Sequence, residues 1–421
     1  MGIDPDSFNI MNANTNTEQL YKDNVLGNYG LPPITFVRGR GLRLWDDSGK
    51  EYLDFCSGIA VTSLGHCHPK LVAAIEGQAN ELICVSNLYR NEVQARLAAK
   101  LNEKAGGNGK VFFCNSGAEA NEALIKLARL HGCQKSGQDG KRYKVVCAKN
   151  AFHGRTFGGM SATPKENVRQ GFAPLVDGFS FAELNNIDSF AAAIDENTAA
   201  VFIETIQGEG GIFPAGNQFL KELRGLCSEK EVLLMIDEVQ CGVGRTGRFF
   251  AFEHAEIKPD AIGMAKGLGG GVPIGGVWVS DQYAELFKPG SHGTTFGGTP
   301  LISAAALAVL ESIDNDGLLK NVEENGAYVM QRLAELRSKY PSYILDVRGV
   351  GFMIGIQIAE SPAEVVPQLR NNGLVVPPAG SNVIRFLPAL TATKEDFDEA
   401  LQKFESVVEE RSATLSEEQD V

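Results

Sequence analysis

The segment GMAKGLGGGVPIG places one lysine, Lys266, between a short apolar run and a stretch dense in glycine. In most proteins a lysine in such a segment is a solvated surface residue. A lysine that loses its proton can instead form a Schiff base with an aldehyde cofactor, and a flexible backbone lets its side chain swing between cofactor and substrate. The second interpretation requires further functional residues near Lys266.

Residues with functional side chains also follow other apolar runs. Ser116, Gly117 and Ala118 come after VFF and open an amphipathic stretch. Small residues at a helix N-terminus expose N–H groups that suit a phosphate. The further candidates are Phe152 and Arg155 after KVVCA, Glu209 after AAVFIE, and Asp237 after VLLMI. Ligands of a parallel α/β sheet bind beyond the carboxyl ends of its strands, so we expect these residues and Lys266 to surround one site.

Pyridoxal phosphate is a cofactor that needs this whole set of groups. Its aldehyde reacts with a lysine, its phosphate suits a helix N-terminus, and a carboxylate such as Asp237 keeps its pyridine nitrogen protonated. Its planar ring requires an apolar or aromatic cover, which Phe152 can supply. The segment Gly242–Gly247 matches the glycine pattern of dinucleotide sites. It neither follows a strand directly nor opens a periodic helix, so we expect no nicotinamide site there.

The positions of these residues depend on elements that we expect between about residues 110 and 280. Runs of β-branched and apolar residues without alternation are typical of strands buried on both faces. The predicted strands cover 111–113, 144–148, 199–204, 232–237 and 261–265. Ala118–His131 carries apolar residues at helical spacing. Strands that alternate with helices predict an α/β fold with a mostly parallel sheet flanked by helices.

The 421 residues suggest one large and one small domain. The pattern of residues 300–340 predicts long helix. The strands predicted after it are spaced differently from those between residues 110 and 280. We expect a polar, disordered leader at 1–25, a segment packing with the small domain at 26–60, a large cofactor-binding domain at 61–299, a small α+β domain at 300–410, and a frayed acidic tail at 411–421.

Composition argues against several partners and compartments. The formal net charge is −13, whereas nucleic acids and anionic membrane surfaces bind basic patches. No apolar stretch approaches the roughly 20 residues that cross a bilayer, and the N-terminus resembles neither a signal nor a transit peptide, so we expect a cytoplasmic protein. Eight scattered cysteines without a C-x-x-C pair indicate reduced thiols. His66-Cys67-His68 has no second ligand cluster at metal spacing, so we expect no metal.

Six segments together resemble the class III pyridoxal-phosphate aminotransferases of fold type I. They are FCNSGAEANEALIKLAR, AFHGRT, FIETIQGEGG, LLMIDEVQCGVGRTG, GMAKGLGGGVPIG and HGTTFGG. The resemblance extends from about Leu26 to Val408, nearly the whole chain. It implies amino-group transfer between small molecules and a homodimer whose active sites lie at the subunit interface.

The resemblance implies a role for each matching residue around the cofactor. Lys266 would hold the cofactor covalently and shuttle a proton, and Asp237 would pair with the pyridinium nitrogen. Phe152 and Val239 would sandwich the ring, and Gln240 would hydrogen-bond its phenolic oxygen. The implied phosphate ligands are Ser116, Gly117 and Ala118, with Thr295 contributed by the other subunit. A protein that kept this fold only for binding would not need the lysine.

The same resemblance implies how the substrates bind. Arg155 would bind the carboxylate of an acylated ornithine near Thr294, because its planar guanidinium suits carboxylates. Arg385 would bind the α-carboxylate of glutamate or 2-oxoglutarate. Glu209 would pair with Arg385 and mask it while the ω-amino donor is bound. A switchable pair of this kind lets one site accept two unlike substrates in turn.

Ile59 bears on the choice of amino donor. Ornithine aminotransferases carry a tyrosine in the segment before GHCHP, where this chain has Ile59, so free ornithine is disfavoured. The string GIAVTSLGHCHP is most similar to members that use N2-acetyl-L-ornithine in arginine biosynthesis. Succinylornithine, N-succinyl-diaminopimelate, ornithine and 4-aminobutyrate remain alternative donors.

Overall fold

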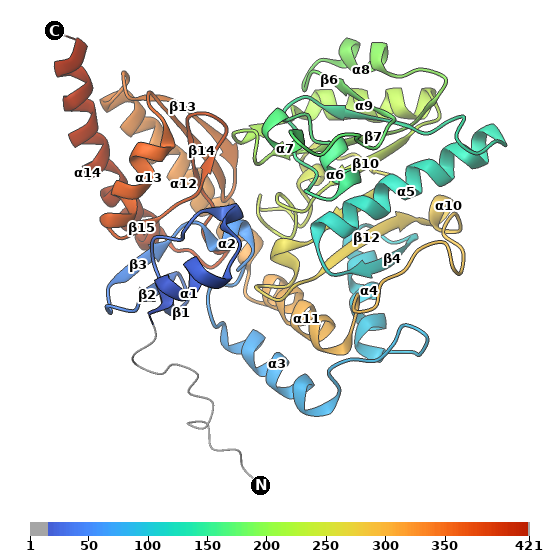
Figure 1. Cartoon of the computed structure of the whole chain (residues 1–421), viewed down its shortest axis with the longest axis horizontal. Coiled ribbons are helices and arrows are strands. Elements are labelled where there is room, and N and C mark those ends of the chain that lie inside the picture. The colour runs from blue at the N-terminus through green and yellow to red at the C-terminus, as the bar shows by residue number, and fades with distance from the viewer. Residues whose placement is uncertain (1–15, 420–421) are drawn as a thin grey trace.

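The computed structural model describes residues 16–419. Figure 1 shows a larger body formed mainly by the middle of the chain and a smaller body formed by the C-terminal part with the first strands. None of the helices in residues 16–419 combines the length and the apolar character needed to span a membrane. All eight cysteines lie in this range, and each is a free thiol.

A seven-stranded sheet forms the centre of the larger body. Its strands in spatial order are β4 (Gly109–Cys114), β12 (Gly275–Ser280), β11 (Ala261–Met264), β10 (Leu233–Asp237), β7 (Thr198–Glu204), β5 (Lys144–Ala148) and β6 (Phe179–Ala182). β12 is antiparallel to β4 and β11, and the other neighbours pair in parallel. The mostly parallel α/β sheet and its five predicted strands are confirmed, whereas β6 and β12 are not among the predicted strands.

Both faces of this sheet are buried, which explains why its strands lack alternation. On one face, Phe202 and Leu233 pack with Leu124 and Leu127 of α5 (Gly117–Ser136). The other face, which includes Val201, packs against further helices. These are α4 (Glu92–Lys104), α8 (Ile187–Ala193), α9 (Asn217–Glu229) and α11 (Pro300–Asn315). Burial on both sides fixes the carboxyl ends of the strands, and so the residues that follow them.

The predicted long helix over 300–340 is two helices. α11 ends before Gly317, whose φ of +66° lies in the left-handed region, and α12 (Leu318–Lys339) begins after it. α11 packs against α3 (Pro69–Glu81) and α4, both of the larger body. We therefore propose that the small domain begins after α11 instead of at residue 300.

The smaller body contains two four-stranded sheets. One has the order β13 (Ile344–Val350), β14 (Met353–Ile358), β17 (Val383–Phe386) and β16 (Pro378–Ala379). The other has the order β1 (Phe36–Arg40), β2 (Arg43–Asp46), β3 (Glu51–Asp54) and β15 (Leu374–Val375). The pairing of β3 with β15 supports the proposal that residues 26–60 pack with the small domain. The helices of this body are α12, α13 (Pro362–Asn371) and α14 (Lys394–Gln419).

Both ends of the described range are more helical than we expect from the sequence. α1 (Thr17–Asn24) occupies the second half of the predicted leader, because Asn16 caps it and Lys22 pairs with Glu18 one turn away. α14 continues through most of the predicted acidic tail, as far as Gln419. The predictions for residues 1–15 and 420–421 lie outside the described residues.

Several short elements connect the larger ones. The helices are α2 (Ser57–Ala60), α6 (Phe157–Ser161), α7 (Glu166–Arg169) and α10 (Asp281–Ala284), with 3-10 turns η2 (Gly27–Tyr29), η3 (Ala251–Ala255) and η4 (Lys266–Leu268). The strands β8 (Ile206–Gln207) and β9 (Phe213–Pro214) form a small hairpin after β7. η4 contributes Lys266 to the cavity described next.

Candidate active site

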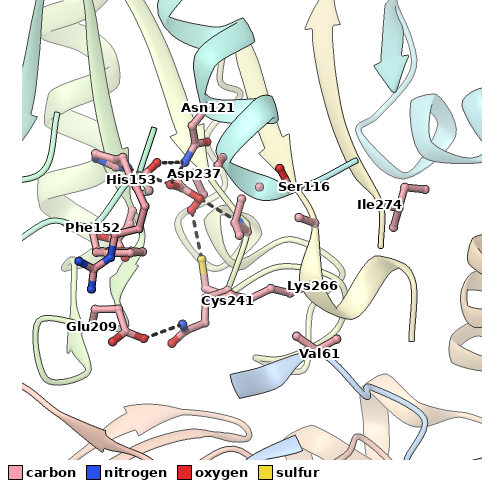
Figure 2. Close-up of a pocket in the computed structure, with 18 of the residues that line it drawn as sticks. Val61, Ser116, Asn121, Phe152, His153, Glu209, Asp237, Cys241, Lys266 and Ile274 are labelled. Carbon is pink, nitrogen blue, oxygen red and sulfur yellow. Dashed lines mark hydrogen bonds and ion pairs between the residues drawn. The ribbon is translucent and has the colours of Figure 1, made fainter. Parts of the chain in front are cut away.

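A cavity of about 410 Å³ opens at the carboxyl ends of β4, β7, β10 and β11. It gathers most of the predicted site residues, although they come from widely separated parts of the chain. These are Ser116, Gly117, Ala118, Phe152, Arg155, Glu209, Asp237, Val239, Gln240 and Lys266. Figure 2 shows Asp237 between His153 and Ser116, and it shows Lys266 and Glu209 below Asp237 in the view. The sequence therefore predicted one site, and the fold forms one cavity from those residues.

The N-terminus of α5 forms one wall of this cavity. Ser116 is the N-cap, and its hydroxyl accepts a hydrogen bond from the backbone N–H of Glu119 at 3.2 Å. A Cβ on Gly117 would lie 2.7 Å from a methyl group of Val239, and one on Gly275 would lie 2.2 Å from the carbonyl oxygen of Ser116. Glycine at both positions therefore lets β12 and the loop after β10 approach the start of this helix. The free N–H groups there favour an anion.

Asp237 is a buried carboxylate at the end of β10, with only 3% of its surface exposed. Its Oδ2 accepts a hydrogen bond from Asn121 Nδ2 at 2.8 Å and lies 2.8 Å from His153 Nδ1. Its Oδ1 accepts from the backbone N–H of Val239 at 3.0 Å. A carboxylate held at both oxygens has a fixed orientation, and this one lines the cavity.

His153 and Asn121 are the functional neighbours that sequence reasoning missed. Burial opposes a charge on His153, but the hydrogen bond to Asp237 outweighs it and raises the pKa of His153 to about 10. The imidazole also stacks on Phe202 at 4.0 Å between ring centroids. His153 lies within the segment AFHGRT, and its place directly after Phe152 is the one signal in the sequence that could have found it.

Lys266 follows β11, and its φ of +43° is rare for a residue with a side chain. Burial lowers its pKa, although Glu209 and Asp237 oppose that effect. Its ammonium makes no ion pair or hydrogen bond with any residue in the range 16–419. A strained lysine without a partner, with a lowered pKa, is suited to act as a nucleophile.

Arg385 and Glu209 form a buried ion pair at the edge of the cavity. Arg385 Nη1 lies 2.5 Å from Glu209 Oε1 and 3.2 Å from Gln240 Oε1, and Nη2 donates to the carbonyl oxygen of Pro378 at 2.8 Å. Burial alone would raise the pKa of Glu209, but Arg385 lowers it on balance. The Nε of Arg385 is buried and has no hydrogen-bond partner within residues 16–419. The pair predicted from the sequence is therefore present in the structure.

Phe152 and Arg155 lie on the β5 side of the cavity. The backbone N–H of Phe152 donates to Glu204 Oε2 at 3.0 Å, which fixes the loop after β5 to the end of β7. Burial raises the pKa of Glu204 to about 7. The guanidinium of Arg155 lies 5.8 Å from the centroid of the Phe152 ring and pairs with no carboxylate in the described range.

Besides Arg385, which pairs with Glu209 of the lining, three predicted residues do not line this cavity. Thr294 lines a separate cavity of about 320 Å³, where its hydroxyl accepts a hydrogen bond from Asn115 Nδ2 at 2.9 Å. Thr295 is exposed in the same loop. Ile59 is 38% exposed, with a φ of +66°. In a single chain these three residues lie apart from Lys266 and Asp237.

The fold and the cavity define a class of protein, and comparison with known proteins agrees with it. The family model for aminotransferase class-III matches residues 27–408. The chain therefore belongs to the class III aminotransferases, and it is an enzyme of the transaminase type. The resemblance that the six sequence segments indicate is confirmed.

Individual relatives make the comparison more specific. The chain is 47% identical to an acetylornithine aminotransferase from Caldanaerobacter subterraneus, over 92% of this chain and 98% of that protein. Its structure is similar to that of ornithine aminotransferase from Toxoplasma gondii, with a TM-score of 0.90, 33% identity and coverage of 94% and 95% of the two chains. The N-acetylornithine aminotransferase of Stenotrophomonas maltophilia has a TM-score of 0.80 at 32% identity, covering 92% and 99%.

Proposed function

We propose that this aminotransferase moves the terminal amino group of N2-acetyl-L-ornithine to 2-oxoglutarate, giving N-acetylglutamate 5-semialdehyde and glutamate in arginine biosynthesis. The observation that carries the proposal is the cavity itself, in which Lys266, without a partner in the described part of the chain, and a fixed Asp237 lie together at the N-terminus of α5. The relatives named acetylornithine aminotransferase support the choice of donor. A cytoplasmic location suits such small soluble substrates.

The residues of the cavity fit pyridoxal 5'-phosphate. The N-terminus of α5, with Ser116, Gly117 and Ala118, suits its phosphate, and the buried carboxylate of Asp237 suits a protonated ring nitrogen. The solved structure of the Toxoplasma relative is described as having this cofactor at partial occupancy in its active site. When bound, the cofactor supplies an electron sink for the carbon that carries the transferred amino group.

In the proposed mechanism, Lys266 holds the cofactor and then moves a proton at the substrate carbon that bears the amino group. Its lowered pKa makes the neutral amine more accessible at neutral pH. Asn121 and His153 fix the orientation of Asp237, and its carboxylate would pair with the protonated ring nitrogen of the bound cofactor. Phe152 and Val239 line the cavity and would hold the ring between them and exclude water from it.

The two substrates place different demands on the same cavity. Arg155, which has no carboxylate partner among residues 16–419, binds the α-carboxylate of the acylated ornithine while Glu209 occupies Arg385. When 2-oxoglutarate enters, Glu209 releases Arg385, which then binds the α-carboxylate of the keto acid. Gln240 contacts both partners of this pair, and it would be the residue that hydrogen-bonds the phenolic oxygen of the bound cofactor.

We further propose a homodimer that completes each site. Thr294, Thr295 and Ile59 lie outside the cavity of a single chain, so contact between their loops and the cavity of a second copy would bring them to it. Several large apolar side chains in neighbouring loops are exposed, as expected of an interface. They include Leu88 (87%), Tyr89 (70%) and Phe296 (61%).

Replacing Glu209 by alanine should shift the enzyme towards α-amino acids. Without its partner, Arg385 is free to bind an α-carboxylate in both half-reactions. We expect the ratio of kcat/KM for glutamate to that for N-acetylornithine to rise about tenfold, or about 1.4 kcal/mol. Separate half-reactions with each donor measure this ratio. An equal loss for both donors would instead indicate that Glu209 only supports the structure.

N-Acetylornithine should exceed free ornithine in kcat/KM by at least about tenfold. Free ornithine brings an α-ammonium that would have to be desolvated beside Arg155, and Ile59 offers no polar partner for it. A panel of N-acetylornithine, ornithine and 4-aminobutyrate, with 2-oxoglutarate as acceptor, measures the preference. A rate for either alternative donor equal to that for N-acetylornithine would overturn the proposed substrate and leave the class of enzyme unchanged.

A further inference from the structure

The glycine-rich segment Gly242–Gly247 joins the larger body to the smaller one. It continues the chain from Asp237 and Gln240, which line the cavity, and it packs against the start of β14. A Cβ on Gly351 would lie 2.7 Å from the carbonyl carbon of Thr246, so the two main chains touch at a position that only glycine allows. The loop that carries cavity residues is therefore in direct contact with the smaller body.

Arg245 is the charged side chain that this segment buries at the contact. It forms no ion pair with an acidic side chain in the range 16–419, and burial lowers its pKa to about 9. Its Nη1 donates to the backbone carbonyl oxygens of Phe352, at 3.4 Å, and of Pro388. Its own carbonyl oxygen accepts from the backbone N–H of Phe352 at 2.9 Å. These hydrogen bonds to the main chain compensate the buried charge.

The two carbonyl groups lie next to the strands that hold Arg385. Phe352 directly precedes β14, and Pro388 comes two residues after β17. β14 and β17 are antiparallel neighbours, with Gly355 opposite Arg385. The guanidinium of Arg245 therefore links the start of β14 to the segment that follows β17, three residues from Arg385.

The place of Arg385 depends on how these strands sit against the loop after β10. Arg385 Nη1 lies 3.2 Å from Gln240 Oε1, and Gln240 precedes Arg245 by five residues in that loop. Arg245 thus bonds both strands that carry Arg385 to the loop that carries its partner in the larger body. A side chain that moves by about 1 Å can lose much of its effect on a bound substrate, so a link at this point bears on function.

We propose that Arg245 is a positioning residue for Arg385, and that it thereby sets how well the keto acid is used relative to the amino donor. The donor binds at Arg155 in the larger body and leaves Arg385 paired with Glu209, so a shift of β17 should affect mainly 2-oxoglutarate. This inference rests on the proposed function, which assigns the α-carboxylate of the keto acid to Arg385. The structural alternative is that Arg245 only stabilises the contact between the two bodies.

The test measures the two half-reactions separately in Arg245→Lys, which keeps a cationic group but ends one bond short of the position of Nη1. Single-turnover absorbance follows N-acetylornithine with the aldehyde form of the cofactor and 2-oxoglutarate with the amine form. We expect kcat/KM for 2-oxoglutarate to fall about tenfold, mainly through a higher half-saturating concentration, and that for N-acetylornithine to stay within about twofold. Arg245→Met, which removes every donor, should shift the same ratio further.

Arg142→Lys is the matched control. Arg142 also donates to backbone carbonyl oxygens, those of Thr198, Lys230 and Glu231. These residues lie at the amino ends of β7 and β10, at the edge of the sheet opposite the cavity. The substitution should leave the ratio of the two half-reactions unchanged.

The other outcomes overturn the inference or leave it standing. An equal fall in both half-reactions of Arg245→Lys, no change in either, or failure of both Arg245 variants to fold would mean that Arg245 serves stability alone, and would overturn it. If only Arg245→Met fails to fold, Arg245→Lys decides the question. A wild type that reacts with another ω-amine and not with N-acetylornithine would overturn the proposed donor, and the comparison with 2-oxoglutarate would still test Arg245.

Discussion

Lys266→Ala should abolish amino transfer and leave the protein folded. Removal of the side chain eliminates both the covalent attachment of the cofactor and the group that moves the proton. Loss of a positioned acid-base group alone costs up to about 10⁴-fold, so we expect kcat to fall by at least about that factor. Steady-state turnover with N-acetylornithine and 2-oxoglutarate measures the fall. The remaining contacts of the cavity should still bind pyridoxal phosphate noncovalently.

The control for this variant is Lys221→Ala, which removes an exposed lysine of α9 that pairs with Glu256 far from the cavity. It should retain full turnover, and thermal unfolding should show that both variants are folded. Borohydride reduction of the wild type, followed by peptide mapping, should place the pyridoxyl label on Lys266. A label on another lysine would remove Lys266 from its proposed role.

Asp237→Asn should lower kcat by about 10³-fold, equivalent to about 4 kcal/mol in the activation free energy, with cofactor still detectable. A neutral amide cannot hold the pyridine nitrogen protonated, so the electron sink weakens. The amide also places an N–H donor against existing donors, either Asn121 and His153 at the position of Oδ2 or the backbone N–H of Val239 at the position of Oδ1. Cofactor content by absorbance and turnover by product formation measure the two effects separately.

Asp260→Asn provides the matched control. Asp260 pairs with Arg224 and caps the backbone N–H of Leu234, at the other end of the same sheet. Its replacement should lower the thermal stability and leave the kcat per bound cofactor unchanged. Near-normal turnover of Asp237→Asn would show that Asp237 does not act on the ring nitrogen.

The position of Lys266 and Asp237 could be predicted because it depends on a local pattern. Each residue ends or follows a short apolar run typical of a strand buried on both faces, and parallel strands present their carboxyl ends at the same edge. β12 could not be predicted in this way, since it begins with Gly275 and Gly276, which are poor strand formers. The structural reason for glycine at position 275 is visible only in the fold, where Gly275 lies against the backbone of Ser116 and leaves no room for a side chain.

The support of Asp237 could not be predicted because it depends on long-range contacts. Asn121 lies on α5 and His153 lies in the loop after β5, and they meet Asp237 from 116 and 84 residues away in the chain. The place of His153 directly after Phe152 only marks it as a neighbour of the site, and nothing in the sequence around Asn121 indicates its contact with Asp237.

The central claim is tested most directly by the half-reaction with a single donor. Purified protein loaded with pyridoxal phosphate should be yellow, and N-acetylornithine without acceptor should bleach the colour in proportion to the number of sites. Addition of 2-oxoglutarate should then restore the colour and release glutamate, because one cavity serves both substrates in turn. A spectrum that N-acetylornithine leaves unchanged, or a bleached form that 2-oxoglutarate does not restore, would contradict the proposed function.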